Sequence, residues 1–546
     1  MRYDGAFGFP PFTRAPYPRY VKNMNDLKIC SAWVRRTTLL AATLVLVACV
    51  QIGSKTDAEY SDIYSREMFD TGYAFITDRY ISAVSLRDLS FSGLAGLHQI
   101  DSNLDIRPTG NNIEVLYQNR TVGRFAAPRN DDPEAWSQAT VDAIAIARSA
   151  SPSLADARAE TVFKAVFDGV LSPLDKFSRY DDAETATEKR AYRDGFGGIG
   201  VTIAKEDTDA LILSVTEGGP AAKAGMREQD RITHVEGESI AGWTQRHLVE
   251  SLRGPINSTV SFTIARTGAS APIVIALTRQ HVVPETVEVR RENGIAIIRL
   301  IGFNVDSAKD LRRTVQRQMR SPDGPPTGFV LDLRSNPGGR LDVSIDVADT
   351  FLDTGDIIAT RGRHPGSRQA FAASKGDETA ERPVVILING NSASASEIVA
   401  AALQDHGRAV VIGTNSFGKG TVQSVLRLPN NGEITLTWSR ILAPSGYRIH
   451  DLGVLPTVCT HGGGDLKSAA TLVPAVREGQ NVLAGEFGNW QATGNIDTAD
   501  RAGLRRICPS DGGSPDVDVA LANAIIADRG LYTSLLRQAN TAVARR

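Results

Sequence analysis

The fold is indicated most directly by one stretch of sequence, Val384-Val-Ile-Leu-Ile-Asn-Gly-Asn-Ser-Ala-Ser-Ala-Ser-Glu397. Its first five residues are apolar and mostly β-branched, which predicts a buried strand. The turn Asn389-Gly-Asn391 follows, and we expect a helix from about Ala395 to Gln404. Unpaired backbone N–H groups at the start of a helix favour negative charge, and they lie here beside Ser392, Ser394 and Ser396. The arrangement suits a nucleophile with an oxyanion hole next to it.

A second motif, Gly418-Lys-Gly-Thr-Val-Gln423, supplies partners for such a serine. Lys419 and Gln423 are four residues apart, so an extended strand would place both on one face. A lysine can act as a general base when burial lowers its pKa, and an amide can hold the amine without adding charge. The two motifs together predict serine hydrolysis with a lysine base. Taken alone, the first motif is better explained as a capping box of Ser394 and Glu397, and the second as an exposed hairpin.

Two competing interpretations fail, the first on residue type and the second on distance. Gly413-Thr-Asn-Ser-Phe-Gly-Lys419 nearly matches a phosphate-binding loop, but Gly420 stands where a metal-binding Ser or Thr is needed. A Ser-His-Asp triad would need His406, which lies about 18 Å beyond Ser394 along a helix that rises about 1.5 Å per residue. Asp405 and His406 are therefore expected to end the helix.

The turn in Leu331-Asp-Leu-Arg-Ser-Asn-Pro-Gly-Gly339 follows another predicted strand. The backbone N–H of Gly338 or Gly339 could complete an oxyanion hole with that of Ala395. A turn with no catalytic part is the alternative.

Residues 195–282 show a different pattern. Gly195-Phe-Gly-Gly-Ile-Gly200 satisfies the dinucleotide motif G-x-G-x-x-G, but a strand-like segment follows where that motif requires a helix. The order of strands and helices resembles a PDZ domain, in which a glycine loop and the next strand bind a peptide's C-terminus. The expected peptide-binding residues are Gly197, Gly198, Ile199, Gly200 and Val201. A small barrel whose glycines only turn corners is the alternative.

Length and composition limit the remaining possibilities. The 546 residues have room for several domains, and 60 Lys+Arg against 62 Asp+Glu leave a net charge of −2. This balance argues against nucleic acid as a partner. Strands alternate with helices from about Val283 to Thr460, which predicts an α/β domain.

Periodicity also predicts individual elements along the chain. We expect helices over Pro133 to Ala150, Ala155 to Leu171, Asp182 to Arg193, Ser307 to Met319 and Val517 to Ala527, and strands over Thr259 to Ala265 and Ile295 to Leu300.

The N-terminus resembles an export signal. Arg35 and Arg36 precede an apolar run from Leu39 to Val50, which is too short to span a bilayer comfortably. Leu46-Val-Ala-Cys49 resembles a lipobox, which predicts cleavage before Cys49 and lipidation of its thiol. An uncleaved anchor and an ordinary signal peptide are the alternatives, and Met24 is a candidate start. Export would leave one cysteine pair, Cys459 and Cys508, as either a disulfide or two buried thiols.

Taken together, the chain resembles the carboxy-terminal processing peptidases, also called tail-specific proteases. The resemblance covers roughly residues 170–460, through motifs in the family's order: Leu174 to Tyr180, the PDZ-like segment, the Asn-Pro-Gly-Gly turn, Ser-Ala-Ser-Ala-Ser, Phe417 to Gln423, Ala443-Pro-Ser-Gly446 and Gly453-Val-Leu-Pro456. It implies that Ser394 is the nucleophile, that Lys419, 25 residues later, is the base, and that Gln423 is the third member. Lys176-Phe177 and Thr457 depart from the family's usual residues.

The resemblance also implies a multidomain α/β fold, with a crotonase-like protease core, an inserted PDZ domain and a mainly helical N-terminal region. We expect an export signal in residues 1–48, the N-terminal region in 49–190, the PDZ-like domain in 191–282, the protease core in 283–462 and a C-terminal extension in 463–546. The expected activity is cleavage of protein C-terminal tails through an acyl-enzyme, with no metal or cofactor. The alternative is a non-catalytic PDZ scaffold.

The expected location is the periplasmic side of a bacterial envelope, with membrane contact through a lipid anchor. The expected partners are protein substrates bound through their C-termini, and an adaptor lipoprotein is a candidate partner.

Overall fold

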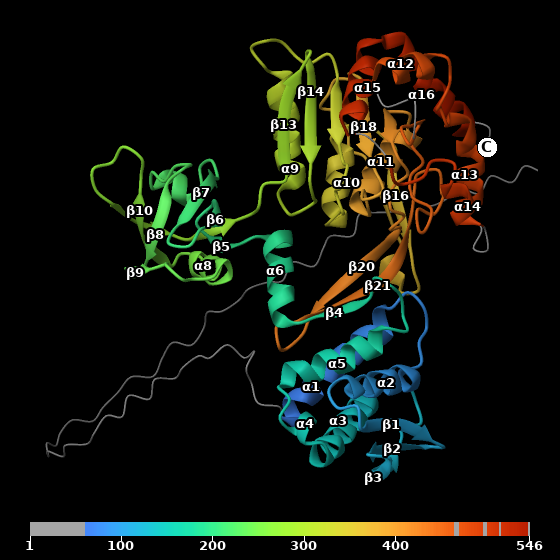
Figure 1. Cartoon of the computed structure of the whole chain (residues 1–546). Helices are drawn as coiled ribbons and strands as arrows, with labels where there is room; N and C mark the ends of the chain where they lie inside the picture. The colour runs from blue at the N-terminus through green and yellow to red at the C-terminus, as the bar shows by residue number, and fades with distance from the viewer. Residues whose placement is uncertain (1–60, 463–468, 495–499, 513–514, 544–546) are drawn as a thin grey trace, which may run out of the picture. The chain divides into compact units, whose positions relative to one another are not determined.

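The computed structural model describes residues 61–462, 469–494, 500–512 and 515–543 (Figure 1). The export signal, Met24 and Cys49 lie outside these residues. Within the described ranges, no helix is both long enough and apolar enough to cross a membrane.

The N-terminal region is mainly helical, as predicted, and also contains a small sheet. Its longer helices are α1 (Asp62–Arg79), α2 (Leu86–Ala95), α3 (Pro133–Ala150) and α5 (Ala159–Leu171), with the short η2 (Gly96–Gln99) and α4 (Pro152–Ala155). The α3 bounds match the prediction, and Asp132 caps its first turn. A single helix was expected from Ala155 to Leu171, but extended backbone at Arg158 separates α4 from α5. The strands β1 (Leu104–Thr109), β2 (Asn112–Tyr117) and β3 (Arg120–Ala126) form an antiparallel sheet that the sequence pattern did not predict.

The PDZ-like segment forms an antiparallel sheet with its own apolar core. Strands β6 (Val201–Lys205), β7 (Ala210–Val215), β8 (Arg231–Val235), β10 (Thr259–Ala265) and β11 (Ile273–Thr278) follow the order β11-β10-β8-β7-β6, and β9 (Glu238–Ser239) pairs with β8. Helices α7 (Pro220–Lys223) and α8 (Gln245–Leu252) complete it. The strand after the glycine loop, β6, is therefore an edge strand. The flanking strands β5 (Phe196–Gly198) and β12 (Gln280–Val282) pair with each other.

The α/β domain is built on a six-stranded sheet of its own, in the order β13-β14-β15-β18-β19-β22. Its strands are β13 (Val287–Glu292), β14 (Ile295–Leu300), β15 (Phe329–Asp332), β18 (Val384–Ile388), β19 (Ala409–Gly413) and β22 (Val458–Cys459). All pairs from β14 to β22 are parallel. One face packs on α9 (Ser307–Met319), α10 (Leu341–Asp349) and α11 (Ala395–Asp405).

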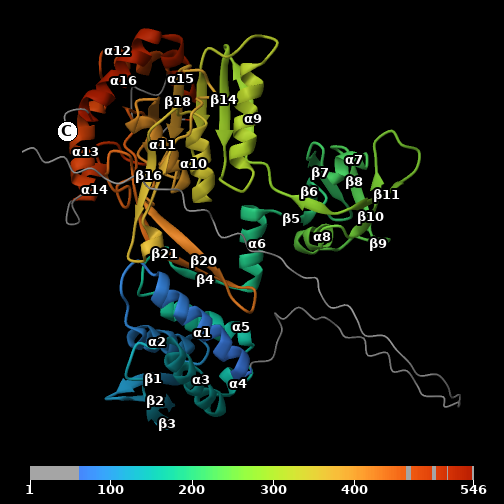
Figure 2. The same ribbon diagram turned by 180° about the vertical axis from the view of Figure 1, so that it is seen from behind.

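The C-terminal extension covers the opposite face of this sheet (Figure 2). In β14, Ala296 and Ile298 belong to the cluster with α11, whereas Ile295 and Ile297 belong to the cluster with the C-terminal helices. The covering helices are α12 (Ala469–Arg477), α15 (Pro515–Ala527) and α16 (Arg529–Val543), while η4 (Ala484–Glu486), α13 (Phe487–Gly494) and α14 (Arg501–Arg505) complete the extension. Burial on both faces explains why Val384–Ile388 is apolar without alternation.

A separate antiparallel sheet carries the last three residues of the second motif, Thr421 to Gln423. Its order is β17-β16-β21-β20, formed by β16 (Asp356–Arg361), β17 (Gln369–Ala372), β20 (Thr421–Arg427) and β21 (Glu433–Leu442), and η3 (Pro365–Ser367) joins the first two. The short β4 (Arg179–Asp181) pairs with β21. Helix α6 (Ala183–Asp194) follows β4 and leads into the PDZ-like segment.

Candidate active site

Ser394 lies at the tip of a sharp turn between β18 and α11. Its backbone has φ 55° and ψ −110°, a conformation that an L-residue adopts at a cost and that is common at functional sites. The neighbouring serines have structural roles instead. Both are fully buried, and their hydroxyls donate to carbonyls, Ser392 to Leu333 at 2.8 Å and Ser396 to Asn336 at 3.0 Å. Of the three serines, Ser394 is the one that lines the pocket described next.

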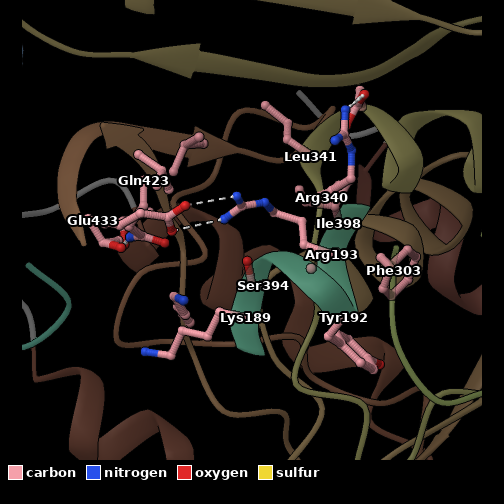
Figure 3. Close-up of a pocket in the computed structure, with 18 of the residues that line it drawn as sticks. Lys189, Tyr192, Arg193, Phe303, Arg340, Leu341, Ser394, Ile398, Gln423 and Glu433 are labelled. Carbon is pink, nitrogen blue, oxygen red and sulfur yellow. Dashed lines mark hydrogen bonds and ion pairs between the residues drawn. The ribbon is translucent and has the colours of Figure 1, made fainter. Parts of the chain in front are cut away.

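The pocket has a volume of about 630 Å³ and brings the three predicted catalytic residues together. Ser394, Lys419 and Gln423 all line it, with Gly339 and Ala395. Figure 3 shows Ser394 and Gln423 in the same pocket, which the Arg193–Glu433 ion pair crosses. The apolar part of the lining comes from Phe303, Leu341, Ile398, Val422, Val425 and Ile441.

Lys419 is half-buried in the segment that joins β19 to β20. Burial and the nearby Arg179 guanidinium lower the pKa of the Lys419 ammonium, while the Glu397 and Asp175 carboxylates act in the opposite direction. The ammonium lies 5.2 Å from the centre of the Phe177 ring. A lysine with a lowered pKa holds more of the free amine that a general base requires.

Gln423 is positioned differently from the expectation. Strand β20 begins at Thr421, after Lys419, and the pairing with β21 shifts register between Val422 and Gln423. The argument that even spacing on a strand places both side chains on one face therefore fails, although both reach the pocket. The Gln423 amide donates to the hydroxyls of Thr421 at 2.8 Å and Thr437 at 3.4 Å. Within the described chain, no hydrogen bond joins the side chains of Ser394, Lys419 and Gln423.

Of the three N–H groups expected as oxyanion-hole donors, the structure leaves those of Gly339 and Ala395 as candidates. The Gly338 N–H already donates to Asn336 Oδ1 at 2.9 Å, so this donor is occupied. Gly339 and Ala395 line the pocket, and among the described residues no hydrogen bond uses their N–H groups. Gly338 has a different role. A Cβ there would lie 2.7 Å from the Ala393 carbonyl oxygen and 2.9 Å from the Ala395 nitrogen, so only glycine lets the turn approach Ser394 closely.

Glu397 is a site residue whose full importance the sequence did not reveal. It forms the predicted capping box with Ser394, and its buried carboxylate accepts from the Ser394 N–H at 2.7 Å. It also accepts from the N–H groups of Gly418 at 2.6 Å and Lys419 at 2.9 Å and from the Ser416 hydroxyl at 2.5 Å. Burial raises the pKa of the Glu397 carboxyl, and these donors oppose the rise. One carboxylate therefore joins the backbone of the serine to that of the lysine, whereas the capping-box spacing signals only the first contact.

The remaining predictions fall outside the pocket. His406 caps the end of α11 and contacts the Asp356 carbonyl, and Asp405 accepts from Ser445, as expected for residues that end a helix. The glycine-loop residues Gly197 and Gly198 lie in β5, Gly200 has φ 77°, and Val201 begins β6. Ile199 is buried and its carbonyl accepts from Ala221. Cys459 and Cys508 form a disulfide. In the part of the chain that is described, no group of three His, Cys, Asp or Glu residues could hold a metal ion.

The sequence matches known protein families and individual proteins. Residues 294–460 match peptidase family S41, and residues 211–266 match a PDZ domain. Over 292 residues the chain is 42% identical to a carboxy-terminal-processing protease of Bartonella bacilliformis, which covers 53% of this chain and 67% of the relative. It is 34% identical to a carboxyl-terminal-processing protease of Synechocystis sp., over 47% of this chain and 61% of the relative.

Among solved structures, a photosystem II D1 C-terminal processing protease is 23% identical and matches with a TM-score of 0.35, covering 73% of this chain and 92% of that one. The sequence matches define a serine-type peptidase with a PDZ domain. The chain belongs to the family of carboxy-terminal processing peptidases.

Proposed function

We propose that this chain is a serine endopeptidase that cleaves protein C-terminal tails through an acyl-enzyme. The Ser394 hydroxyl attacks the scissile carbonyl and gives its proton to the Lys419 amine, while the N–H groups of Gly339 and Ala395 donate to the oxyanion. The peptide C–N bond then breaks, and Lys419 passes the proton to the departing amine. Water, deprotonated by the same lysine, hydrolyses the ester and releases the Ser394 hydroxyl. The observation that carries the proposal is that Ser394, Lys419 and the two N–H groups share one pocket.

Gln423 is proposed to orient the Lys419 amine during catalysis. This step requires the amide to leave Thr421 and Thr437, which now accept its hydrogen bonds. Hydrogen bonds of catalytic groups are often incomplete without substrate and tighten when substrate binds. Substrate binding in the pocket is therefore proposed to make the Gln423 amide exchange the threonine hydroxyls for the Lys419 amine.

The PDZ domain is proposed to bind the free C-terminus of the substrate. Strand β6 lies at the edge of its sheet and can pair with an extended peptide, and the preceding glycine loop is suited to the terminal carboxylate. We also propose that the chain is exported to the periplasmic side of the envelope and lipidated at Cys49. An adaptor lipoprotein is proposed as a further partner.

The test uses an unstructured polypeptide with a free C-terminus, with its products read by mass spectrometry. Ser394→Ala and Lys419→Ala should each lower turnover by at least about 1,000-fold, because loss of either member removes the activated nucleophile. A fluorophosphonate should label wild-type Ser394 but leave the Ser394→Ala variant unmodified. An amidated tail should be cleaved with a higher KM.

Ser396→Ala and Lys189→Ala are the matched controls, because Ser396 is bonded to a carbonyl and Lys189 pairs with Asp181 in the same pocket region. Both should keep most of the activity. Tail binding without shortened products from the wild-type chain would instead favour the non-catalytic scaffold.

A further inference from the structure

The segment that carries Lys419, residues 416–420, is named here the lysine loop. Glu397 holds one side of it through three hydrogen bonds. The other side rests on residues 449–454: the Asp451 N–H donates to the Gly418 carbonyl at 2.8 Å, and the Val454 N–H donates to the Ser416 hydroxyl at 2.7 Å. The position of the general base therefore depends on how these two segments are held together.

Arg505 connects the two segments. Its guanidinium donates to the Ser416 carbonyl at 2.9 Å and to the Leu452 carbonyl at 2.7 Å. A Cβ on Gly418 would lie 3.3 Å from Arg505 Nη1, and a Cβ on Gly453 would lie 3.0 Å from the same atom. The guanidinium thus packs against glycines in both segments.

The charge of Arg505 also bears on the site. The side chain is half-buried, and burial lowers the pKa of its guanidinium while the carboxylates of Glu397 and Asp451 oppose that shift. The same attraction favours the ionised form of the buried Glu397. An ionised Glu397 accepts the N–H groups of Ser394 and Lys419 more strongly than a protonated one.

Arg505 is fixed to the sheet by a covalent link close to it in sequence. It is the last residue of α14, and Cys508, three residues later, is bonded to Cys459 of β22. Strand β22 pairs with β19, which leads into the lysine loop. The hydroxyl of Thr414, the residue after β19, donates to the Ser510 carbonyl at 3.1 Å. Arg505 and Cys508 both lie outside residues 294–460, which match the peptidase family.

We propose that Arg505 is a positioning residue for Lys419, and that the Cys459–Cys508 disulfide holds it in place. The C-terminal extension thereby takes part in assembling the site. The inference rests on the proposed function, because its readout is the turnover that depends on Ser394 and Lys419.

The test compares Arg505→Met with Arg505→Lys in the full chain. Methionine keeps the unbranched apolar stem but removes the guanidinium, and with it the charge and both hydrogen bonds, and should lower kcat on the order of 10- to 100-fold with KM within about twofold. Lysine keeps the charge but lacks the two-pronged geometry, so it should restore only part of kcat. The control is Arg506→Met, since Arg506 is exposed and pairs only loosely with Asp500, at 3.8 Å.

The pH profile separates positioning from a general loss of folded enzyme. A loosened lysine loop exposes Lys419 to water, which moves its pKa toward the ordinary value. The limb of kcat/KM that rises with pH should therefore move to higher pH in Arg505→Met. A lower fraction of folded protein would reduce kcat without moving this limb, and that result would overturn the proposal.

The role of the disulfide is tested by a double-mutant cycle with Cys459→Ala and Cys508→Ala together. The cysteine pair change should lower kcat in the wild-type background and change it by less than about twofold in the Arg505→Met background. Equal effects in the two backgrounds would reject the disulfide as the element that holds Arg505. If wild type is active and Ser394-dependent while Arg505→Met matches Arg506→Met, this inference fails and the proposed function stands. An inactive wild type would count against the proposed function itself.

Discussion

The Lys419 ammonium is subject to opposing influences from its neighbours. Burial and Arg179 lower its pKa. The ring of Phe177, 5.2 Å away, attracts the charged form and so favours a higher pKa. Phe177 is one of the positions at which the sequence departs from the family's usual residues. The departure therefore lies against the proposed catalytic base.

Phe177→Leu should shift the rising limb of kcat/KM to lower pH. Leucine keeps the site apolar but removes a cation–π contact worth about 0.5–1 kcal/mol, or roughly half a pH unit. Because the base acts as the free amine, a lower pKa extends activity toward acid. The measurement is a pH profile of kcat/KM. The control is Phe417→Leu, because Phe417 is an exposed aromatic residue in the lysine loop. A shift to higher pH would show that Phe177 acts chiefly by excluding water.

At the scale of elements, one buried acid joins helix α6 to the sheet that contains β20 and β21. Glu433, the first residue of β21, accepts from Arg190 at 3.0 Å and from Arg193 at 3.2 Å. Both arginines lie on α6, which leads into the PDZ domain. A pattern of polar residues predicted the helix but not this attachment, because its partner is about 240 residues away.

Glu433→Gln should reduce the free energy of unfolding by about 1–3 kcal/mol, since it removes the buried counter-charge that Arg190 and Arg193 share and leaves Arg193 with Asp194 alone. It should also raise KM, because Arg193 and Glu433 both line the pocket. Urea unfolding and substrate titration provide the two measurements. For the unfolding measurement the control is Glu188→Gln, an exposed change on the same helix, and equal unfolding midpoints for the two variants would refute a stabilising role for these ion pairs.

Local patterns predicted many elements well. Helix α9, strand β14 and strand β10 begin and end at the predicted residues, because their periodicity and end signals are encoded within each segment. The register shift in β20 was not predictable in this way. It depends on pairing with β21, and it invalidated the argument that Lys419 and Gln423 share a strand face.

At the scale of the whole molecule, the C-terminal extension is a structural part of the α/β domain. It buries one face of the parallel sheet and delivers Arg505 to the lysine loop. The sequence predicted a helix there but assigned the extension no place. The proposed attachment to the envelope is a separate property of the whole chain, and it depends on Cys49.

Cys49→Ser should move the protein from the membrane fraction to the soluble fraction of an expressing bacterium. A buried acyl chain contributes about 0.8 kcal/mol per CH₂ to membrane binding, and serine cannot accept the thioether-linked lipid. Mass spectrometry of the N-terminal peptide checks the modification. The control is Cys30→Ser, a change within residues 1–48 that the expected cleavage removes, and it should leave both results unchanged. Membrane retention of Cys49→Ser with residues 1–48 still attached would favour an uncleaved anchor.

The chemistry of the site was available from the order of residues along the chain. A serine at the start of a helix, a lysine flanked by glycines and two turns rich in backbone N–H groups are local features, and their residue types determine which reactions are open to them. The three-dimensional structure decided the rest. It separated Ser394 from its two buried neighbours, occupied the Gly338 N–H, and brought Glu397 and Arg505 to the lysine loop. These outcomes depend on contacts between segments far apart in sequence, whose burial and hydrogen bonding arise only when the sheet is assembled and covered on both faces.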